Sequence, residues 1–301
     1  MLSRIAMGYF MNKENSTTNT MIDSPNSILT LKHIFGNNRL DITRYKIQFL
    51  KRRIERRMQI REISDFNEYL HLLESDSTEL SYMFESLSIN VTSFFRDAVV
   101  FNALRAMIVP KMLSNIENNE KITAWSAGCA SGEEPYSIAI LLNDISEIYK
   151  KIGISKKFTI RIKATDINKK AIDFAKNGQY SSKFLQHLSV DLKKKYFINI
   201  QSKDDSKYEI TPKIKDLIDF ERMDILSSPA NTYDIIFCRN VLIYYEKEAQ
   251  ELILKKLHNC LKNEGYLILG SDELLIGKKT ENLFYPVMMK EKIFQKINLL
   301  K

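Results

Sequence analysis

Cysteine, histidine, proline and glycine are all scarce in this sequence. It contains 3 cysteines, 4 histidines, 6 prolines and 9 glycines among 301 residues. So little glycine and proline excludes a collagenous or low-complexity chain. The cysteines form no C-x-x-C pair and cannot build a disulfide framework, and the histidines show no metal-ligand spacing with them. We therefore expect no metal site. The cysteines are Cys129, Cys238 and Cys260.

Long apolar runs are also missing. No uninterrupted run approaches the ~20 residues that a membrane-spanning helix needs. The apolar stretch 5–11 is too short for the core of a signal peptide, and polar residues follow it in place of a cleavage site. We therefore expect a cytoplasmic protein that does not insert into a membrane.

The rest of the composition is that of a globular chain with a basic excess. Hydrophobic residues make up 44% and charged residues 27%, and the net charge is +8. The window 41–61 holds eight Lys or Arg against two acids, so it accounts for +6 of that charge. Because the basic character is local, the total charge is weak support for a nucleic-acid partner.

Two regions of different periodicity follow a polar N-terminal segment. Residues 1–26 are rich in Asn, Thr and Ser, which predicts a disordered or loosely held tail. Residues 27–88 have helical spacing, with short helices predicted at 65–73 and 78–87, so we expect a small all-helical domain. One apolar stripe in this region consists of Ile47, Leu50, Ile54 and Met58.

From about residue 122, predicted strands alternate with predicted helices. The strands are 122–125, 158–164, 233–237 and 265–270, and the helices are 135–149, 168–177 and 247–261. This alternation predicts an α/β domain with a parallel, doubly wound sheet. Segments 196–200 and 208–211 flank a polar turn, which predicts an antiparallel hairpin inserted at about 195–219.

A turn with two glycines follows the first predicted strand. It reads SAGCASGEEP from Ser126 to Pro135, and its G-x-x-x-G spacing matches neither the dinucleotide fingerprint nor the phosphate-binding loop. Glu133 and Glu134 would repel phosphates and suit a cationic ligand. The alternative is that they only occupy a helix N-terminus, where acids are favoured.

Two further acids end predicted strands. Asp166 ends the second strand, where a carboxylate commonly accepts hydrogen bonds from ribose hydroxyls, although Asp there is also a common helix N-cap. Asp224 ends another candidate strand and is placed to face the same crevice. A ligand with a ribose, a cationic amino-acid moiety and no phosphate would be S-adenosylmethionine.

Four longer motifs extend this interpretation. They are NVTSFFRD at Asn90–Asp97, WSAGCASGEEPYS at Trp125–Ser137, ATDI at Ala164–Ile167 and IFCRNVLIY at Ile236–Tyr244. In sequence and order they closely resemble the chemotaxis receptor methyltransferases, the CheR family, and the resemblance extends from about residue 27 to 294. It implies a Rossmann-like class I methyltransferase domain over 89–301 with the antiparallel insertion, preceded by a receptor-recognition domain over 27–88.

The resemblance also implies an activity and a set of site residues. Members of this family transfer a methyl group from S-adenosylmethionine to glutamate side chains in the cytoplasmic helices of chemoreceptors, leaving S-adenosylhomocysteine. Our hypothesis is that Arg96 steers the incoming carboxylate and that Tyr244 donates a hydrogen bond to it. The alternatives are a surface salt bridge of Arg96 with Asp97 or another acid, and core packing of Tyr244 beside the sheet. No general base is needed, because a glutamate with a reference pKa of ~4.3 is ionised at neutral pH. The implied cofactor contacts are Asn90, Thr92, Arg96, Gly128, Glu133, Asp166, Asp224, Ile225, Arg239 and Asn240.

A row of arginines on the predicted helix of the apolar stripe falls on its opposite face. The resemblance implies that this face contacts the acidic methylation region of a receptor, and a merely solvated helix face is the alternative. The row consists of Arg52, Arg53, Arg56 and Arg57.

Two departures from the family pattern stand out. Residues 270–273 read Gly-Ser-Asp-Glu where relatives commonly have Gly-His-Ser-Glu. The hairpin turn 201–207 lacks the glycines of relatives that bind a receptor's C-terminal pentapeptide, so we expect no tethering by strand addition.

Other functions remain open. Nucleic-acid methylation is disfavoured. Enzymes that methylate amino groups of bases generally have an Asn/Asp-Pro-Pro-aromatic turn, and here no proline precedes another proline. Cytosine C5 enzymes need a nucleophilic cysteine, typically after a proline, and here no cysteine follows a proline. A non-catalytic adaptor that binds the cofactor, or a methyltransferase with a non-receptor acceptor, is the alternative. We expect a monomer without a nucleic-acid partner, whose recruitment to membrane receptor arrays is compatible with the resemblance.

Overall fold

The contacts within the chain divide it into two compact units. The helical unit comprises the described residues up to Leu87 together with Tyr244–Ala249, and the α/β unit comprises those of Ser88–Ile243 and Gln250–Lys301. The structure is a computed structural model. It describes residues 24–298 apart from 38–39, 89–91, 116–119, 155–157, 202–205, 228, 276, 278–279 and 281.

Short helices with side-chain caps build the helical unit. They are α2 (Pro25–Gly36), η1 (Ile42–Arg44), α3 (Ile47–Ile60), α4 (Phe66–Ser75) and α5 (Ser77–Ser86). Ser24 caps α2, so the last residues of the predicted tail already belong to this helix, and the rest of that tail lies outside the described residues. Asp65 and Asp76 cap α4 and α5 by accepting backbone N–H bonds. The two short helices predicted here are confirmed, with boundaries shifted by one or two residues.

Helix α3 buries its apolar stripe and divides its arginines. Leu50, Ile54 and Met58 are buried, and Ile47 is half-buried. Arg52 and Arg56 are exposed on the opposite side. The predicted amphipathic helix is therefore confirmed.

Arg57 belongs to the interior of the helical unit. Its guanidinium donates two hydrogen bonds to the carboxylate of Glu79, at 2.9 and 2.6 Å, and the Tyr69 hydroxyl donates a third at 2.9 Å. Glu79 is only 1% exposed. The hydrogen bonds to Glu79 raise the pKa of Arg57. This arginine therefore holds α3, α4 and α5 together.

The segment Tyr244–Ala249 packs within the helical unit. The Tyr245 ring stacks on that of Tyr45 with centroids 4.6 Å apart, and an isolated backbone bridge joins the same two residues. The Tyr244 ring lies 4.8 Å from the ring of Phe49 on α3. Tyr244 is therefore held by the helices, although it lies only a few residues beyond the fourth parallel strand in chain order.

A seven-stranded sheet in the order β6-β2-β1-β7-β8-β10-β9 forms the centre of the α/β unit. The first five strands of this order are parallel. The strands are β1 (Lys121–Ala127), β2 (Thr159–Asp166), β6 (Ile218–Arg222), β7 (Tyr233–Cys238), β8 (Leu261–Leu269), β9 (Phe284–Met288) and β10 (Ile293–Lys296).

The prediction of a parallel sheet is right for five strands and wrong for the edge. Strands β10 and β9 run antiparallel, so the sheet is mixed. Neither strand carries a clear periodic signal, because β10 has four residues and β9 contains Pro286. Proline is tolerated only at such an edge.

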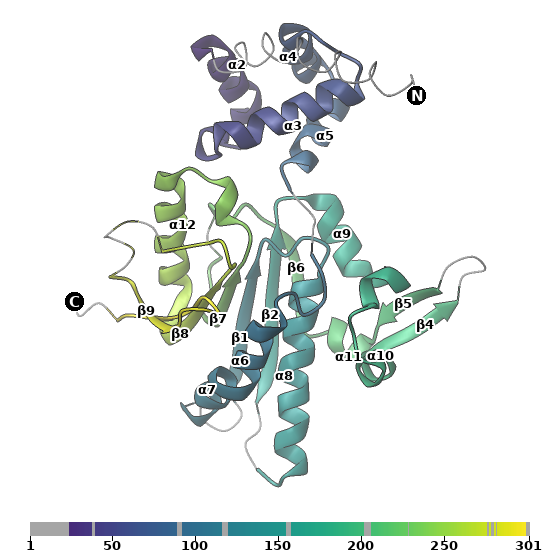
Figure 1. Cartoon of the computed structure of the whole chain (residues 1–301), viewed down its shortest axis with the longest axis vertical. Helices are drawn as coiled ribbons and strands as arrows, with labels where there is room; N and C mark the ends of the chain where they lie inside the picture. The colour runs from purple at the N-terminus through teal and green to yellow at the C-terminus, as the bar shows by residue number, and fades with distance from the viewer. Residues whose placement is uncertain are drawn as a thin grey trace, which may run out of the picture. The chain divides into compact units, whose positions relative to one another are not determined.

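Helices pack on the sheet and complete the α/β unit. Figure 1 shows α8 alongside β1 and β2, and α12 beside β7 and β8. The connection from β1 through α8 to β2 moves toward one edge of the sheet, and the connection from β7 through α12 to β8 moves toward the other. Because such connections are right-handed, α8 and α12 lie on opposite faces of the sheet. The helical stretch from α6 to α7 was not predicted. The helices are α6 (Ala98–Ala103), the π-helical η2 (Leu104–Ile108), α7 (Val109–Asn115), α8 (Glu133–Lys151), α9 (Lys169–Asn177), η4 (Leu242–Tyr244) and α12 (Lys247–Cys260).

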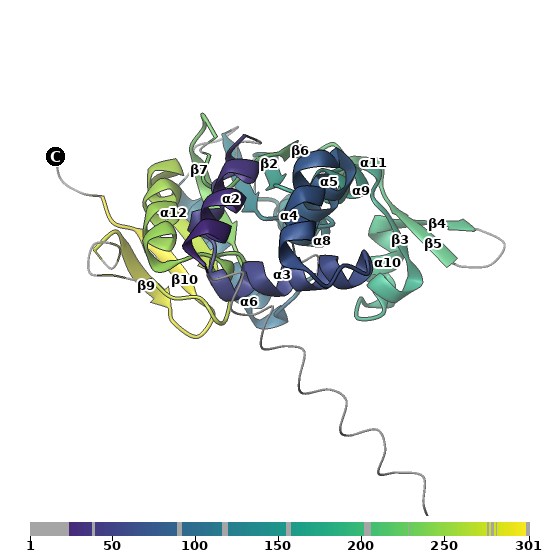
Figure 2. The ribbon, with the colours of Figure 1, turned by 90° about the horizontal axis from the view of Figure 1, so that it is seen from above.

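A small antiparallel sheet in the order β3-β5-β4 is inserted between α9 and β6. Figures 1 and 2 show its β4–β5 hairpin at the side of the α/β unit opposite β9. The predicted hairpin is confirmed, whereas the three-residue β3 is too short for a sequence signal. Its elements are β3 (Gln179–Ser181), η3 (Ser182–Leu185), α10 (Val190–Tyr196), β4 (Phe197–Gln201), β5 (Ser206–Ile210) and α11 (Pro212–Lys215).

Ion pairs fasten this insertion to α8. Lys195 on α10 contacts Asp144 at 2.7 Å and Glu147 at 2.8 Å, and Lys213 on α11 contacts Glu147 at 2.6 Å. The hydrogen bonds from Lys195 and Lys213 lower the pKa of Glu147 to about 2. The anchor therefore stays charged at any physiological pH.

No helix within the described residues is long and apolar enough to cross a bilayer.

The Arg57–Glu79 pair supports a first prediction. Replacing Arg57→Leu removes the two-bond partner of the buried Glu79 and leaves it only the longer contact with Arg61, at 3.6 Å, so we expect the free energy of unfolding to fall by ~2–3 kcal/mol in urea denaturation. The matched change Arg56→Leu, on the exposed face of the same helix, should alter it by no more than ~0.5 kcal/mol. Equal losses in the two variants would contradict the structural role of Arg57.

Candidate active site

Two turns meet at the carboxyl edge of the sheet. From the centre the chain continues from β1 to β2 on one side and from β7 to β8 on the other, so a ligand crevice is expected where these directions diverge. Gly128 follows β1 with φ +83°, and a Cβ there would lie 2.4 Å from Cγ2 of Val241, after β7. The two turns are therefore in close contact, and this packing requires glycine at position 128.

Glu133, the first residue of α8, carries a buried oxygen that lacks a partner. The residue is 0% exposed, and its Oε2 accepts a hydrogen bond from Ser131 at 2.7 Å. Its Oε1 has no hydrogen-bond partner among the described residues. Burial raises the pKa of this carboxyl, and the bond from Ser131 opposes the rise. Such a group costs ~1–3 kcal/mol of stability and indicates a site for a cationic or donor ligand.

Asp166 joins the end of β2 to the glycine-containing turn. Its Oδ2 accepts the Ala130 N–H at 2.9 Å, and its Oδ1 accepts the Asn168 N–H at 2.9 Å and the Ser88 hydroxyl at 3.3 Å. Burial raises its pKa, against the lowering effect of these bonds. Asp166 thus shapes the turn, and its oxygens retain lone pairs for a further donor.

The residues that follow β6 lie beside Asp166. The Met223 N–H donates to the Asp166 carbonyl at 3.0 Å. Asp224 accepts the Leu226 N–H at 2.9 Å, and Ile225 is buried. The structure therefore brings the predicted ribose and adenine residues to one corner of the crevice.

Arg239 is the buried centre of an ion-pair cluster that includes the buried Glu134 and the exposed Asp97. Its side chain is 2% exposed and pairs with Asp97 and, at 3.4 Å, with Glu134. It also donates to the Arg96 carbonyl at 3.2 Å. Glu134 accepts a further bond from the Ser126 hydroxyl at 2.7 Å. The guanidinium therefore joins the end of β7 to α8 and to the segment before α6.

The segment 92–97 is fixed by its aromatic side chains. Phe94 lies 4.9 Å from Tyr180 and 5.2 Å from Phe197 between ring centroids. The Phe95 N–H donates to Ser137 on α8 at 2.8 Å. Phe95 and Asp97 both adopt positive φ angles, of 52° and 60°. Tertiary contacts must maintain this strained path. It presents the predicted residues Thr92 and Arg96, both partly exposed, whereas Asn90 lies outside the described residues.

The other predicted residues belong to the helical unit. Tyr244 contacts Phe49 as described above, and Arg53 lies 5.2 Å above the same Phe49 ring. Burial lowers the pKa of Arg53, and the neighbouring Arg56 adds to this effect. Arg53 is therefore partly engaged inside the unit, and of the four predicted arginines Arg52 and Arg56 remain exposed.

Sequence reasoning missed two participants. Asp97 gave no signal, because its partner Arg239 is 142 positions away along the chain. Glu273 was noticed only as part of an altered motif, yet its carboxylate accepts four backbone N–H bonds from the ends of β7 and β8.

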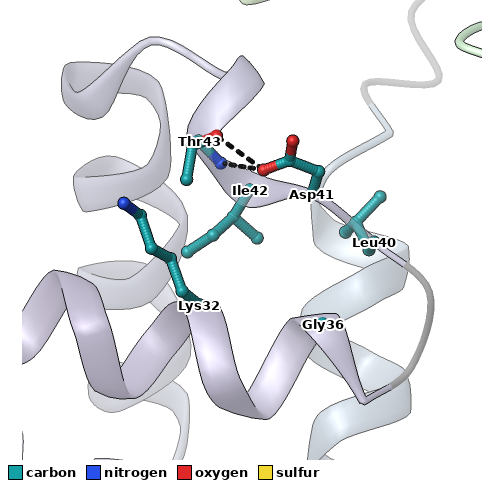
Figure 3. A pocket seen from close by; sticks show the side chains of 6 residues that line it. All are labelled: Lys32, Gly36, Leu40, Asp41, Ile42 and Thr43. Carbon is teal, nitrogen blue, oxygen red and sulfur yellow. Dashed lines mark hydrogen bonds between the residues drawn. The ribbon is translucent and has the colours of Figure 1, made fainter.

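A pocket in the helical unit contains none of the predicted site residues. It has a volume of about 360 Å³ and is lined by Lys32, Gly36, Leu40, Asp41, Ile42 and Thr43. Figure 3 shows Asp41 turned toward Thr43, from which it accepts bonds at 3.1 and 2.6 Å. Its carboxylate is satisfied internally, and we assign the pocket no function. Nowhere in the described part of the chain do three His, Cys, Asp or Glu side chains gather as metal ligands.

The Arg239 cluster supports a second prediction. Replacing Arg239→Met leaves Glu134 buried without its cation, so we expect the free energy of unfolding to fall by ~3 kcal/mol. Amide exchange in 93–97 should also become faster. The matched change Arg105→Met breaks a partly exposed pair with Asp144 and should cost at most ~1 kcal/mol. Unaltered exchange in 93–97 would show that Arg239 does not hold this segment.

Comparison with known proteins finds family matches over most of the chain. Residues 90–293 match the family described as "CheR methyltransferase, SAM binding domain", and residues 31–88 match "CheR methyltransferase, all-alpha domain". A chemotaxis protein methyltransferase of Borreliella burgdorferi is 29% identical over 93% of this chain and 98% of its own length. That of Listeria monocytogenes is 32% identical over 82% of this chain and 90% of its own.

Solved structures are more distant. A S-adenosylmethionine-dependent methyltransferase from Clostridium acetobutylicum is 17% identical, with a TM-score of 0.31 over 58% of this chain and 52% of its own. This likeness is too weak to carry an argument. The two family matches together span nearly all of the residues on which the predicted site depends. The chain belongs to the CheR family of S-adenosylmethionine-dependent methyltransferases.

Proposed function

We propose that this protein transfers a methyl group from S-adenosylmethionine to glutamate side chains of chemoreceptors, giving glutamate methyl esters and S-adenosylhomocysteine. The observation that carries the proposal is the buried, unpartnered Oε1 of Glu133 at the carboxyl edge of a sheet in a chain of the CheR family. A cationic ligand would explain why acids lie at this Rossmann-like site, where a site for a nucleotide phosphate would have hydrogen-bond donors.

The residues at this edge fit the cofactor. S-adenosylmethionine supplies a methyl group activated by a positively charged sulfur. Glu133 would accept a hydrogen bond from its ammonium group, which satisfies the orphaned oxygen. Asp166 would accept ribose hydroxyls, and Asp224 with Ile225 would flank the adenine. Gly128 and Asn240 would line the crevice between the two turns.

One predicted contact, Arg239, takes a different role. The guanidinium of Arg239 is committed to Asp97 and Glu134, so we propose that it holds Arg96 in place instead of touching the reacting sulfur. Thr92, Arg96 and Asn90 would close over the cofactor from the segment before α6.

The acceptor requires orientation more than activation. A glutamate carboxylate is already ionised and nucleophilic at neutral pH, with a reference pKa of ~4.3. Arg96 would steer it by a charge-assisted contact, and the Tyr244 hydroxyl would donate a hydrogen bond to it. Orientation of this kind can supply ~7–11 kcal/mol of the barrier reduction.

The exposed arginines of α3 suit an acidic receptor surface. Arg52 and Arg56 point to solvent, whereas Arg57 is bound to Glu79 and Arg53 is half-buried over Phe49. We therefore propose Arg52 and Arg56 as the main contacts, with Arg53 beside them. The protein would act in the cytoplasm as a monomer, recruited to receptor arrays through the receptors' cytoplasmic helices.

Glu133 provides a third prediction. At pH 7, Glu133→Gln should weaken S-adenosylhomocysteine binding by ~1.5–3 kcal/mol, a factor of roughly 10 to 150 in Kd, because a charged hydrogen bond to the ammonium is lost. Titration calorimetry measures this. The control Glu147→Gln on the same helix should bind within twofold of the unaltered protein.

The same variant tests the electrostatics of the free protein. Because burial raises the pKa of Glu133, its charge destabilises the folded state at neutral pH, and this penalty disappears as the pH falls through the raised pKa. Glu133→Gln should therefore leave the melting temperature unchanged or higher. A lower melting temperature with unaltered binding would oppose the assigned role.

Methyl transfer itself is tested with labelled cofactor. The full-length protein is incubated with methyl-labelled S-adenosylmethionine and a receptor cytoplasmic fragment, and the product is treated with alkali. We expect volatile labelled methanol, which identifies a carboxyl methyl ester. Tight cofactor binding without alkali-labile label would instead favour an adaptor or another acceptor.

The recognition face supports a fourth prediction. The double variant Arg52→Glu and Arg56→Glu should lower kcat/KM for the receptor fragment at least fivefold at 0.1 M salt. The difference should shrink at 1 M salt, where the Debye length falls from ~10 to ~3 Å. The control Lys176→Glu and Lys183→Glu makes the same charge change on exposed residues of the α/β unit and should have little effect. A rate insensitive to salt would remove this role.

A further inference from the structure

Glu273 is a buried acid surrounded by backbone donors. It is 2% exposed. Its Oε1 accepts the N–H groups of Val241 and Leu242, both at 2.7 Å. Its Oε2 accepts those of Asn240 at 3.0 Å and Gly270 at 2.6 Å. No side-chain cation pairs with it among the described residues, so backbone dipoles alone stabilise the carboxylate.

These four bonds join the ends of two neighbouring strands. Gly270 follows β8, and Asn240 begins the turn after β7 with φ +59°, a left-handed conformation uncommon outside glycine. Three consecutive N–H groups of this turn point to one carboxylate, so the strained backbone has a specific anion to hold it. The contact is also tight, because a Cβ on Gly270 would lie 2.8 Å from both the Asn240 nitrogen and Glu273 Oε2.

The altered motif leaves this arrangement intact. Ser271 and Asp272, which replace the His-Ser of relatives, both have exposed side chains, whereas Glu273 points inward. The change therefore affects the surface of the turn. The buried carboxylate that reaches β7 is retained.

We propose that Glu273 is a positioning residue, which sets the backbone of the Asn240–Leu242 turn so that the cofactor crevice is formed before ligand arrives. The turn carries Asn240, supplies Val241 against Gly128, and follows directly on the Arg239 that holds Asp97. Loss of the carboxylate would release all three at once. This inference rests on the proposed function only where cofactor binding is used as its measure.

The test replaces the carboxylate by its amide. In either orientation, the NH₂ group of Glu273→Gln faces two backbone N–H donors and can accept from neither. We expect amide exchange of Asn240–Leu242 to accelerate at least tenfold, and S-adenosylhomocysteine to bind at least tenfold more weakly, at a temperature where the variant is fully folded. Glu273→Asp, which keeps the charge on a shorter chain, should recover part of both effects.

A matched control separates positioning from general stability. Asp234 near the start of β7 accepts the Thr123 N–H at 2.7 Å, at the opposite edge of the same sheet. Asp234→Asn should lower the melting temperature while leaving exchange at Asn240–Leu242 and ligand binding within twofold of the unaltered protein. Gly270→Ala, which crowds the same contact, should reproduce the effects of Glu273→Gln if that variant folds poorly.

The outcomes are distinct. Unchanged exchange at Asn240–Leu242 in both Glu273→Gln and Gly270→Ala would overturn the proposal, as would binding by both within twofold of the unaltered protein. If the unaltered protein itself bound no S-adenosylhomocysteine, the proposed function would fail, and amide exchange alone would decide the role of Glu273.

Discussion

A buried guanidinium at the end of β7 joins three segments that are far apart in the sequence. Arg239 pairs with Asp97 before α6 and with Glu134 in the first turn of α8, and it also binds the Arg96 carbonyl. Arg239 and Glu134 are largely buried, so either charge would be unfavourable there by itself. Because they neutralise one another, the strained path through Phe95 and Asp97 can persist beside the sheet edge. The placement of Arg96 depends on that path.

Charge is distributed unevenly around this edge. Glu134 has a cation and Asp166 has backbone donors, whereas one oxygen of Glu133 has neither. Proteins commonly retain such destabilising groups where a ligand satisfies them, because the stability lost in the free protein is recovered when the ligand binds. The carboxylate of Glu273 is stabilised by backbone N–H groups instead of by a cation. The carboxyl edge of the sheet thus holds two kinds of buried acid, one with an unpartnered oxygen and one bound by backbone donors.

Helix α3 of the helical unit carries both structural contacts and exposed arginines. The buried side of α3 carries the stripe that packs the unit, and its flank carries Arg57 bound to Glu79. Phe49 on the same helix contacts Tyr244, which follows β7 in the chain. Arg52 and Arg56 are exposed to solvent. Four arginines that look equivalent in sequence therefore have different surroundings, and only burial distinguishes them.

Local patterns were enough to predict much of this protein. Periodicity predicted the amphipathic α3, four of the five parallel strands and the inserted hairpin, because each depends on spacing within a short window. The fifth, β6, was expected only as a candidate strand ending at Asp224, and it ends at Arg222. The turn from Gly128 to Glu133 and the strand-end Asp166 indicated a cationic, ribose-bearing ligand, because parallel strands bring their carboxyl ends to one edge.

Tertiary structure alone decided the rest. The antiparallel edge strands β9 and β10 and the short β3 have too few residues for a periodic signal. The pairing of Asp97 with Arg239, the engagement of Arg57 and the four bonds to Glu273 join residues that are distant along the chain or depend on backbone direction. Sequence determines which charges and donors are present, but only the folded chain decides which of them meet, because burial forces each to find a partner.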